Sequence, residues 1–237
     1  MTRVMFVGDI HGNLDLMYSR CRDWEKSNQI KLDLIIQVGD FEAIRWPGKE
    51  FNISGPRKYR KPGDFPEYFT GNKMALYPTF FIGGNHEDYD FLDQYKNGQQ
   101  VAHNIFYLGR SGMIKIGSSN VAYLSGIYNY DHFESQHPEL NMNGYSKTQR
   151  TRAIYFNKED IEKLDLNPDI LITHDIPTFE VKRESPNYLD YLVETLNPAH
   201  HICGHLHYLR YVRTKNETQI RVLSHIGRSG DLLFLEL

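Results

Sequence analysis

Short apolar segments alternate along the chain with polar turns and with stretches of helical periodicity. Residues 4–7 form one apolar segment, and residues 13–26 then place apolar side chains at helical spacing. Residues 32–38 and 79–82 form two more apolar segments. Near-continuous apolar strands that alternate with helices are typical of parallel sheets whose faces are covered by helices. The pattern therefore predicts an α/β fold, with Asn13 as the N-cap of the first helix.

The middle of the chain has a different spacing. Apolar segments at residues 105–108, 113–116 and 121–124 follow one another closely, which favours antiparallel hairpins and a mixed sheet. Residues 42–72 and 128–148 are rich in Gly, Pro, Asn and charged residues and predict two long loops. Later elements are predicted as strands at 169–173, 202–203, 208–212, 219–223 and 232–235, and as a helix at 188–196.

The composition is that of an ordinary globular protein. The 237 residues suffice for one sizeable core, so we expect a single domain, residues 1–237. Hydrophobic residues make up 40%, and no apolar run reaches the length of about 18 residues that a transmembrane helix needs. The N-terminal apolar segment is too short for a signal peptide, and Cys21 and Cys203 cannot form a disulfide framework. We therefore expect a cytoplasmic protein, and the net charge of −3 excludes a general polyanion binder.

The 11 histidines are not scattered evenly. Five of them lie in short polar segments that directly follow predicted strands. In an α/β sheet the carboxyl ends of the strands line the binding crevice, so these segments are expected to converge. The five segments that follow predicted strands are Gly8-Asp9-Ile10-His11, Gly39-Asp40, Gly84-Asn85-His86-Glu87, His174-Asp175 and Gly204-His205-Leu206-His207.

The residue types in these segments are those that bind metal ions. In Asp9-x-His11 and His205-x-His207, alternate residues of an extended segment point to the same side, so each pair can hold one ion. The two oxygens of Asp40 can bridge two ions. Mixed histidine and carboxylate ligands favour Mn, Fe or Zn over Mg or Ca. The sequence therefore predicts a transition-metal centre.

These segments, in this order, resemble the motifs of the calcineurin-like metallophosphoesterase superfamily over nearly the whole chain. The resemblance implies a four-layer sandwich of two mixed β-sheets flanked by helices, with a centre of two divalent metals. His86 would stand beside the scissile phosphate without binding a metal. By motif, one metal would be held by Asp9, His11, Asp40 and His207, and the other by Asp40, Asn85, His174 and His205.

Two-metal chemistry would supply the reaction. Metals roughly 3.5–4 Å apart lower the pKa of a shared water and hold the phosphoryl oxygens, so that the resulting hydroxide attacks phosphorus. His86 would then donate a proton to the leaving oxygen or stabilise its charge. Glu87 has two open interpretations, since it can orient His86 or cap the helix that follows.

A narrower resemblance connects the chain to the RNA lariat debranching enzymes, which cleave the 2′,5′-phosphodiester at a branch point. It covers roughly residues 3–180, and the doubled glycine before Asn85 is fairly specific. That family typically has cysteine at the position of Asp9 and a C-terminal region beyond the catalytic domain, whereas this chain ends 30 residues after His207. The matching stretches are Lys58-Tyr59-Arg60, Phe69-x-Gly71, 81–87, 101–109, Ser125-Gly126-Ile127, Arg152-Ala153-Ile154-Tyr155 and 174–177.

In that family the segment equivalent to residues 128–155 recognises the substrate. Together with residues 42–72 it carries, in this chain, the basic and aromatic side chains that suit phosphates and stacked bases. A solvated surface is the alternative interpretation of both loops. The substrate contacts predicted on this basis are Arg57, Lys58, Tyr59, Arg60, Arg150, Arg152 and Tyr155.

The leading hypothesis is a binuclear-metal phosphodiesterase that acts on RNA or another nucleotide diester. A phosphomonoesterase, a protein-phosphatase-like enzyme and a dinucleoside polyphosphate hydrolase are the alternatives. Phosphatases of that type usually carry an arginine soon after the second strand, which Gly39-Asp40-Phe41-Glu42 lacks. A non-catalytic scaffold on this fold would have lost metal ligands, whereas every ligand position is filled here. No membrane partner is expected, and the oligomeric state stays open.

Overall fold

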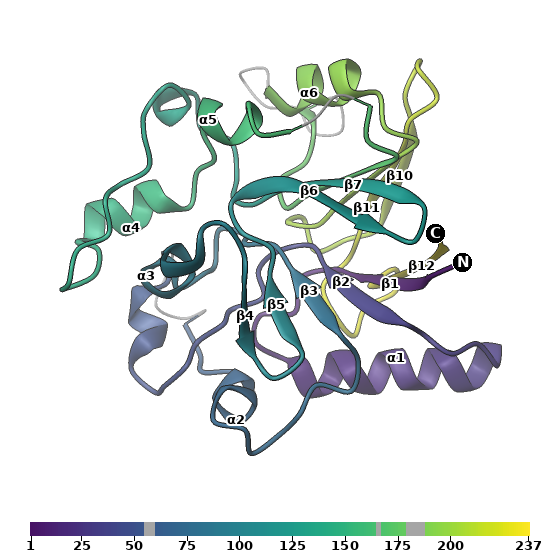
Figure 1. Ribbon diagram of the computed structural model, residues 1–237, viewed down its shortest axis with the longest axis horizontal. Coiled ribbons are helices and arrows are strands. Elements are labelled where there is room, and N and C mark those ends of the chain that lie inside the picture. Colours follow the sequence, from purple (N-terminus) through teal and green to yellow (C-terminus); the bar gives the residue numbers. More distant parts are fainter. Residues whose placement is uncertain (55–59, 165–166, 179–187) are drawn as a thin grey trace.

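The computed structural model describes residues 1–54, 60–164, 167–178 and 188–237. Two six-stranded sheets lie face to face, and helices cover their outer faces (Figure 1). The layers are therefore helix, sheet, sheet and helix, which confirms the fold class predicted from the sequence. No helix in the described part of the chain is long and apolar enough to cross a membrane.

The two sheets share one topology. In each, four central strands run parallel, and an antiparallel strand forms either edge. The first sheet has the order β12 (Leu232–Glu236), β1 (Arg3–Val7), β2 (Leu34–Gln37), β3 (Thr79–Phe81), β5 (Ile105–Tyr107) and β4 (Gln99–Ala102). The second has the order β10 (Arg210–Arg213), β11 (Gln219–Val222), β9 (His200–Cys203), β8 (Ile170–Thr173), β7 (Ser119–Leu124) and β6 (Ser111–Ile116).

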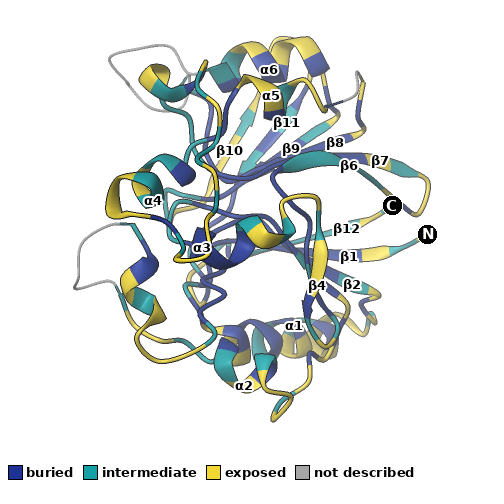
Figure 2. Ribbon diagram, turned by 60° about the vertical axis from the view of Figure 1, so that its left-hand side comes forward, coloured by how far each residue is buried: buried dark blue, intermediate teal, exposed yellow. Residues whose placement is uncertain are grey.

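Side chains alternate between apolar layers along each central strand. Val4 of β1 points into the layer between the sheets, whereas its neighbour Met5 packs on helix α1 (Leu14–Asn28). On the outer face of the second sheet, Leu171 packs against helix α6 (Tyr188–Leu196). Strands β1 and β8 are thus buried on both faces over most of their length (Figure 2), which explains their largely apolar sequences.

Short helices interrupt the segments that were predicted as long loops. Residues 42–72 contain two of them, and residues 128–155 contain two more. The sequence had suggested that both segments are irregular throughout. The short helices show that neither of them is. The short helices of the described chain are η1 (Lys49–Asn52), α2 (Phe65–Phe69), α3 (Tyr89–Leu92), η3 (Asp93–Tyr95), η4 (Tyr130–His132), α4 (Lys147–Ala153) and α5 (Lys158–Ile161).

The pairing of β5, the strand β4 and the start of α1 each differ in detail from what the sequence predicts. Strand β5 forms no hairpin with β6, since β5 pairs with β3 and β4 in the first sheet while β6 and β7 belong to the second. Strand β4 was not predicted because it lies at a sheet edge and begins with the exposed Gln99 and Gln100. Asn13 is the N-cap residue of α1, as predicted, although its side chain makes no capping hydrogen bond. Its Nδ2 atom instead donates to the carbonyl oxygens of Ile10 and His11.

Candidate metal centre

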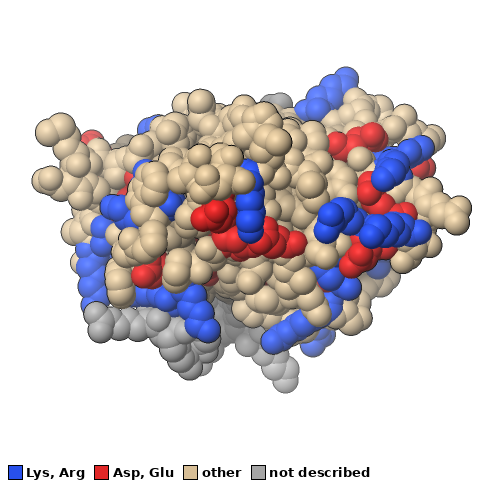
Figure 3. All heavy atoms as spheres, turned by 90° about the horizontal axis from the view of Figure 1, so that it is seen from below, with Lys and Arg blue, Asp and Glu red and all other residues tan. Residues whose placement is uncertain are grey.

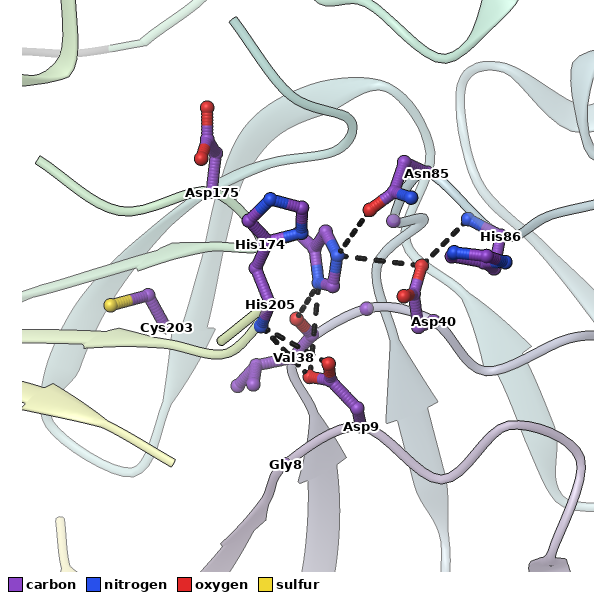
Figure 4. Close-up of polar contacts among 12 residues, drawn as sticks. Gly8, Asp9, Val38, Asp40, Asn85, His86, His174, Asp175, Cys203 and His205 are labelled. Carbon is purple, nitrogen blue, oxygen red and sulfur yellow. Dashed lines mark hydrogen bonds and ion pairs between the residues drawn. The ribbon is translucent and has the colours of Figure 1, made fainter. Parts of the chain in front are cut away.

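Polar side chains from both sheets meet where parallel strands end. Asp9, Asp40 and Asn85 follow β1, β2 and β3 of the first sheet. His174 directly follows β8 of the second sheet, and His205 lies two residues beyond β9. Figure 4 shows these side chains directed toward one another. The structure therefore brings the predicted segments together.

Four donor residues form the first cluster: Asp9, His11, Asp40 and His207. Each offers a ligand atom within 4.8 Å of the others. Nε2 of His11 lies 3.1 Å from Nε2 of His207, which in turn lies 3.0 Å from Oδ2 of Asp9. Nε2 of His11 is also 3.7 Å from Oδ2 of Asp40. Two imidazole nitrogens and two carboxylates placed in this way suit Zn, Mn or Fe.

His174 approaches the other oxygen of Asp40. Its Nε2 atom is 3.4 Å from Oδ1 of Asp40 and 3.1 Å from Oδ1 of Asn85. Nδ1 lies 3.1 Å from the carbonyl oxygen of Val38, and donation to this oxygen leaves Nε2 as the nitrogen that can bind a metal. One oxygen of Asp40 thus faces His11 and the other faces His174, as a bridging ligand would. Figure 4 shows the contact between Asp40 and His174. The ring of His205 packs edge-on against His174, with centroids 5.1 Å apart.

The turns that carry these side chains have an unusual backbone. His11, Asp40, Glu42, His205 and His207 have positive φ angles, between 44° and 70°. Residues other than glycine rarely adopt this left-handed region, and such strain is concentrated at functional sites. The expectation of extended Asp-x-His and His-x-His pairs is therefore wrong. In His205-x-His207 the backbone turns at both histidines and directs the two rings to different partners.

Two glycines allow the backbone to approach the ligands. A Cβ atom on Gly84 would lie 2.2 Å from Oδ1 of Asp40 and 2.8 Å from Nε2 of His174. A Cβ atom on Gly39, whose φ is 96°, would lie 2.5 Å from Nδ1 of His174. No other residue type fits these contacts without displacing a proposed ligand. Steric crowding thus explains why glycine, and no larger residue, stands at these positions next to the proposed ligands.

The electrostatics of the centre favour positive charge. Burial lowers the pKa of His11, but the hydrogen bond to Glu42 and the charge of Asp40 outweigh it and raise this pKa to about 9. Burial also opposes protonation of His174, yet the charges of Asp40 and Asp9 raise its pKa to about 10. Burial alone would raise the pKa of Asp40, whereas His174 and His11 hold it well below its usual value. Buried carboxylates therefore attract cationic groups here, which fits the binding of metal ions.

Glu42 is a candidate functional residue that the sequence analysis missed. Its side chain is buried, and Oε1 accepts a hydrogen bond from Nδ1 of His11 at 2.6 Å. A carboxylate behind a metal-binding imidazole orients the ring and raises its basicity. Glu42 also forms a group with His11 and His86 whose ligand atoms lie within 4.8 Å of one another. Its only signal in the sequence is its place in the turn that begins at Asp40.

Glu87 has neither of the two roles considered for it. Its buried carboxylate accepts the backbone N–H groups of Phe41 and Glu42 at 2.7 and 2.9 Å, and that of Gly84 at 3.4 Å. It does not cap α3, which begins at Tyr89. Burial and the charge of Asp40 raise the pKa of Glu87 to about 8. Glu87 therefore positions the turn that carries Asp40 and Glu42.

We expect Glu87→Gln to lower the free energy of unfolding by about 1–3 kcal/mol, because a glutamine NH₂ cannot accept the backbone N–H that it would face. Urea unfolding of the metal-free and the Mn-loaded protein measures the change. Glu194→Gln, on the exposed face of α6, is the matched control and should alter stability by less than about 0.5 kcal/mol. Equal unfolding midpoints for the two variants would contradict the positioning role.

A cavity of about 540 Å³ reaches the first cluster, and His11, His86 and His207 line it. Burial lowers the pKa of His86 from its usual value. The sequence analysis missed two further lining residues. They are His225, whose ring stacks on that of His11 with centroids 5.3 Å apart, and Arg228.

Comparison with known protein families identifies the family of the chain. Residues 2–209 match the model of the family described as calcineurin-like phosphoesterase. The chain belongs to this family. Its membership confirms the prediction of a metal-dependent hydrolase of phosphoester bonds, and the clustered Asp and His side chains are the candidate metal ligands of this phosphoesterase.

The phosphoesterase is similar to several curated lariat debranching enzymes. That of Arabidopsis thaliana is 31% identical in an alignment of 229 positions that covers 86% of this chain and 54% of that protein. That of Schizosaccharomyces pombe is 33% identical in an alignment of 232 positions that covers 86% of this chain and 48% of that protein. The chain thus spans about half the length of these relatives. That of Entamoeba histolytica is 28% identical in an alignment of 254 positions, gaps included, that covers 99% of this chain and 72% of that protein.

Among solved structures, the crystal structure of TT1561 from Thermus thermophilus shares the fold of this phosphoesterase. Its TM-score is 0.51 at 13% sequence identity, and the match covers 99% of this chain and 98% of that chain. At this identity the similarity concerns the fold alone. The four-layer architecture is thus shared over the full length of both chains.

The predicted substrate contacts that lie in the described part of the chain do not line the cavity. Arg150 of α4 binds both carboxylate oxygens of Asp90 through Nε and Nη2, at 3.1 and 2.7 Å. Its guanidinium thus joins α4 to α3 in this structure. Tyr155 stacks on His132 with centroids 5.1 Å apart. Arg60, Arg152 and Tyr155 are absent from the cavity lining, and Arg57, Lys58 and Tyr59 lie outside the described residues.

Proposed function

We propose that the chain is a binuclear-metal-dependent phosphodiesterase that acts on RNA or nucleotide diesters, including the 2′,5′ linkage of a branch. The observation that carries this proposal is the meeting of four donor residues at a cavity that His86 also lines. The similarity to lariat debranching enzymes supports the class of substrate. Because the two sheets share one apolar layer, we also propose that residues 1–237 act as a single domain.

The proposed metal sites follow from the donor atoms. The first cluster would hold one metal, and His174 with Asn85 would hold the other, with Asp40 shared and His205 beside them. Two bound metals supply Lewis-acid polarisation of the phosphoryl group and make water more acidic. The donors suit Mn, Fe and Zn alike.

His86 has the proposed role at the leaving oxygen. Its backbone N–H donates to Oδ1 of Asp40 at 2.7 Å, which fixes the residue beside the shared carboxylate. Its ring lies 5.3 Å from that of His11, centroid to centroid, and lines the cavity. The imidazole is thus placed to hold a proton for the oxygen that leaves phosphorus.

The face of the molecule over α1 and α2 does not offer a simple site for a polyanion. Seen over α1 and α2, Lys and Arg side chains alternate with Asp and Glu side chains (Figure 3). A protein that binds nucleic acid without selectivity presents instead a patch of one sign. Recognition is therefore proposed to depend on the cavity.

The deciding experiment offers the Mn-loaded chain a 2′,5′-branched RNA and the linear 3′,5′-linked RNA of the same sequence. We expect release of the 2′-linked strand, an intact linear RNA, and no reaction after chelation. Cleavage of both RNAs would indicate a general phosphodiesterase. Turnover of only p-nitrophenyl phosphate or a dinucleoside polyphosphate would favour those alternatives, and a metal-loaded but inactive chain would favour a scaffold.

A further inference from the structure

Two cationic side chains line the cavity together with the proposed metal ligands. Lys61 and Arg228 both lie in the lining that includes His11 and His207. The guanidinium of Arg228 donates to the carbonyl oxygen of His207 at 3.4 Å. Within the described residues, no carboxylate lies at ion-pair distance from either cation. The charges of both side chains are therefore available to a ligand in the cavity.

The turn that carries Arg228 is anchored at the centre. The backbone N–H of Ile226 donates to the carbonyl oxygen of Asp9 at 2.9 Å. The buried Asp231 accepts the backbone N–H of Gly227 at 2.8 Å and binds Arg20 through both of its oxygens, at 3.0 and 2.8 Å. Arg228 therefore projects from a backbone whose position is set by the strand that carries Asp9.

The backbone next to Lys61 is anchored in the same region. A Cβ atom on Gly63 would lie 2.2 Å from the carbonyl oxygen of Gly12, so the two chain segments are in close contact. The backbone N–H of Asp64 donates to this same oxygen at 2.9 Å, and its carboxylate accepts the backbone N–H of Asp15 at 2.7 Å. Lys61 thus projects from a segment held against the turn that carries His11.

We propose that Lys61 and Arg228 form a subsite for a second phosphate of the substrate, one that is not cleaved. The ammonium and guanidinium groups both bind phosphate oxygens by charge-assisted hydrogen bonds. The ring of His225 forms part of the wall, and its Nδ1 atom is held 2.8 Å from the carbonyl oxygen of Ile226. The inference rests on the proposed function, because the subsite serves the same reaction.

A neighbouring phosphate is a chemical property of the proposed substrate. The ribose at a 2′,5′ branch carries a 3′-phosphodiester beside the 2′-phosphodiester that is broken. A simple diester such as bis(p-nitrophenyl) phosphate has no second phosphate. The subsite would therefore select substrates with two phosphates on one nucleotide over simple diesters.

The test uses a matched pair of chromogenic esters, thymidine 5′-(p-nitrophenyl phosphate) with and without a 3′-phosphate. We expect the Mn-loaded chain to prefer the 3′-phosphorylated ester in kcat/KM by about tenfold or more, the effect of one charge-assisted hydrogen bond. In Lys61→Met and in Arg228→Met this preference should fall toward one. Lys115→Met and Arg213→Met, which remove exposed cations of β6 and β10, are the controls and should keep it.

A binding measurement keeps the proposal testable without turnover. Thymidine 3′,5′-bisphosphate should bind more tightly than thymidine 5′-phosphate in calorimetry, and the two cavity variants should remove the difference. A preference near one in the unmodified chain, or one that survives both substitutions, would overturn the subsite. Failure of the proposed function is distinguishable, since branched RNA would then stay intact while the preference for the bisphosphate persists.

Discussion

Replacing Asp40 by asparagine is expected to lower hydrolysis of bis(p-nitrophenyl) phosphate by at least about a hundredfold, since indirect partners of metal ligands already cost ten- to a hundredfold. Asp40 is 1% exposed, and its two oxygens face His11 and His174 at 3.7 and 3.4 Å. Asparagine retains the shape but has no charge and only one acceptor oxygen. Both proposed metals would therefore lose their shared ligand.

Two measurements check this expectation. Rates are compared with Mn, Fe and Zn, and the metal content of protein purified without chelator is determined by elemental analysis. The variant should keep its fold, because the asparagine oxygen can still accept the backbone N–H of His86, 2.7 Å from Oδ1 of Asp40. Asp33→Asn, an exposed carboxylate that accepts a backbone N–H, is the matched control. Full activity and full metal content in Asp40→Asn would remove Asp40 from the proposed centre.

Much of the architecture could be predicted because it depends on burial. Strands β1 and β8 are covered on both faces, so their sequences had to be continuously apolar. The convergence of Asp9 and Asp40 followed from topology, since the carboxyl ends of the neighbouring parallel strands β1 and β2 share one edge of the first sheet. The assignment of β5 failed because neighbouring segments of the chain enter different sheets, and local spacing does not record such a crossing.

The residues behind the proposed ligands could not be predicted, because their contacts depend on turn geometry. Glu42 reaches His11 through a turn in which Asp40 and Glu42 both have positive φ angles. When a residue other than glycine adopts a positive φ angle, the sequence gives no clear indication of it. His225 reaches the cavity from a turn joined to β1 by long-range hydrogen bonds, which no local pattern indicates.

The roles of the basic residues in the two loops could not be predicted from the sequence, for a related reason. Arg150 has the charge and the aromatic neighbours of a nucleic-acid contact, but Asp90 of α3 engages its guanidinium. Lys61, at the end of the basic run in the first loop, is the member of that run that lines the cavity in the described chain. Residue type alone cannot separate a structural cation from a binding one, because the difference is the presence of a long-range partner.

His86→Ala is expected to lower turnover of a branched RNA far more than turnover of bis(p-nitrophenyl) phosphate. A positioned acid contributes about 10²–10⁴-fold where the leaving oxygen needs a proton. The ribose oxygen that leaves from a branch needs one, whereas p-nitrophenolate leaves as a stable anion. The ring of His86 lines the cavity beside that of His11, so it can reach such an oxygen. The kcat values of both substrates on one Mn-loaded preparation measure the difference.

Measurement of the metal content distinguishes proton donation by His86 from metal binding by His86. His86 belongs to a group with His11 and Glu42 whose ligand atoms lie within 4.8 Å, so the structure also permits it to bind a metal. A full metal content, with a loss that grows as the leaving group becomes more basic, would support the proton role. His103→Ala, at an exposed turn between β4 and β5, is the matched control and should change neither rate. Loss of metal with an equal fall on both substrates would instead make His86 a ligand, because the missing function would then be common to every phosphodiester.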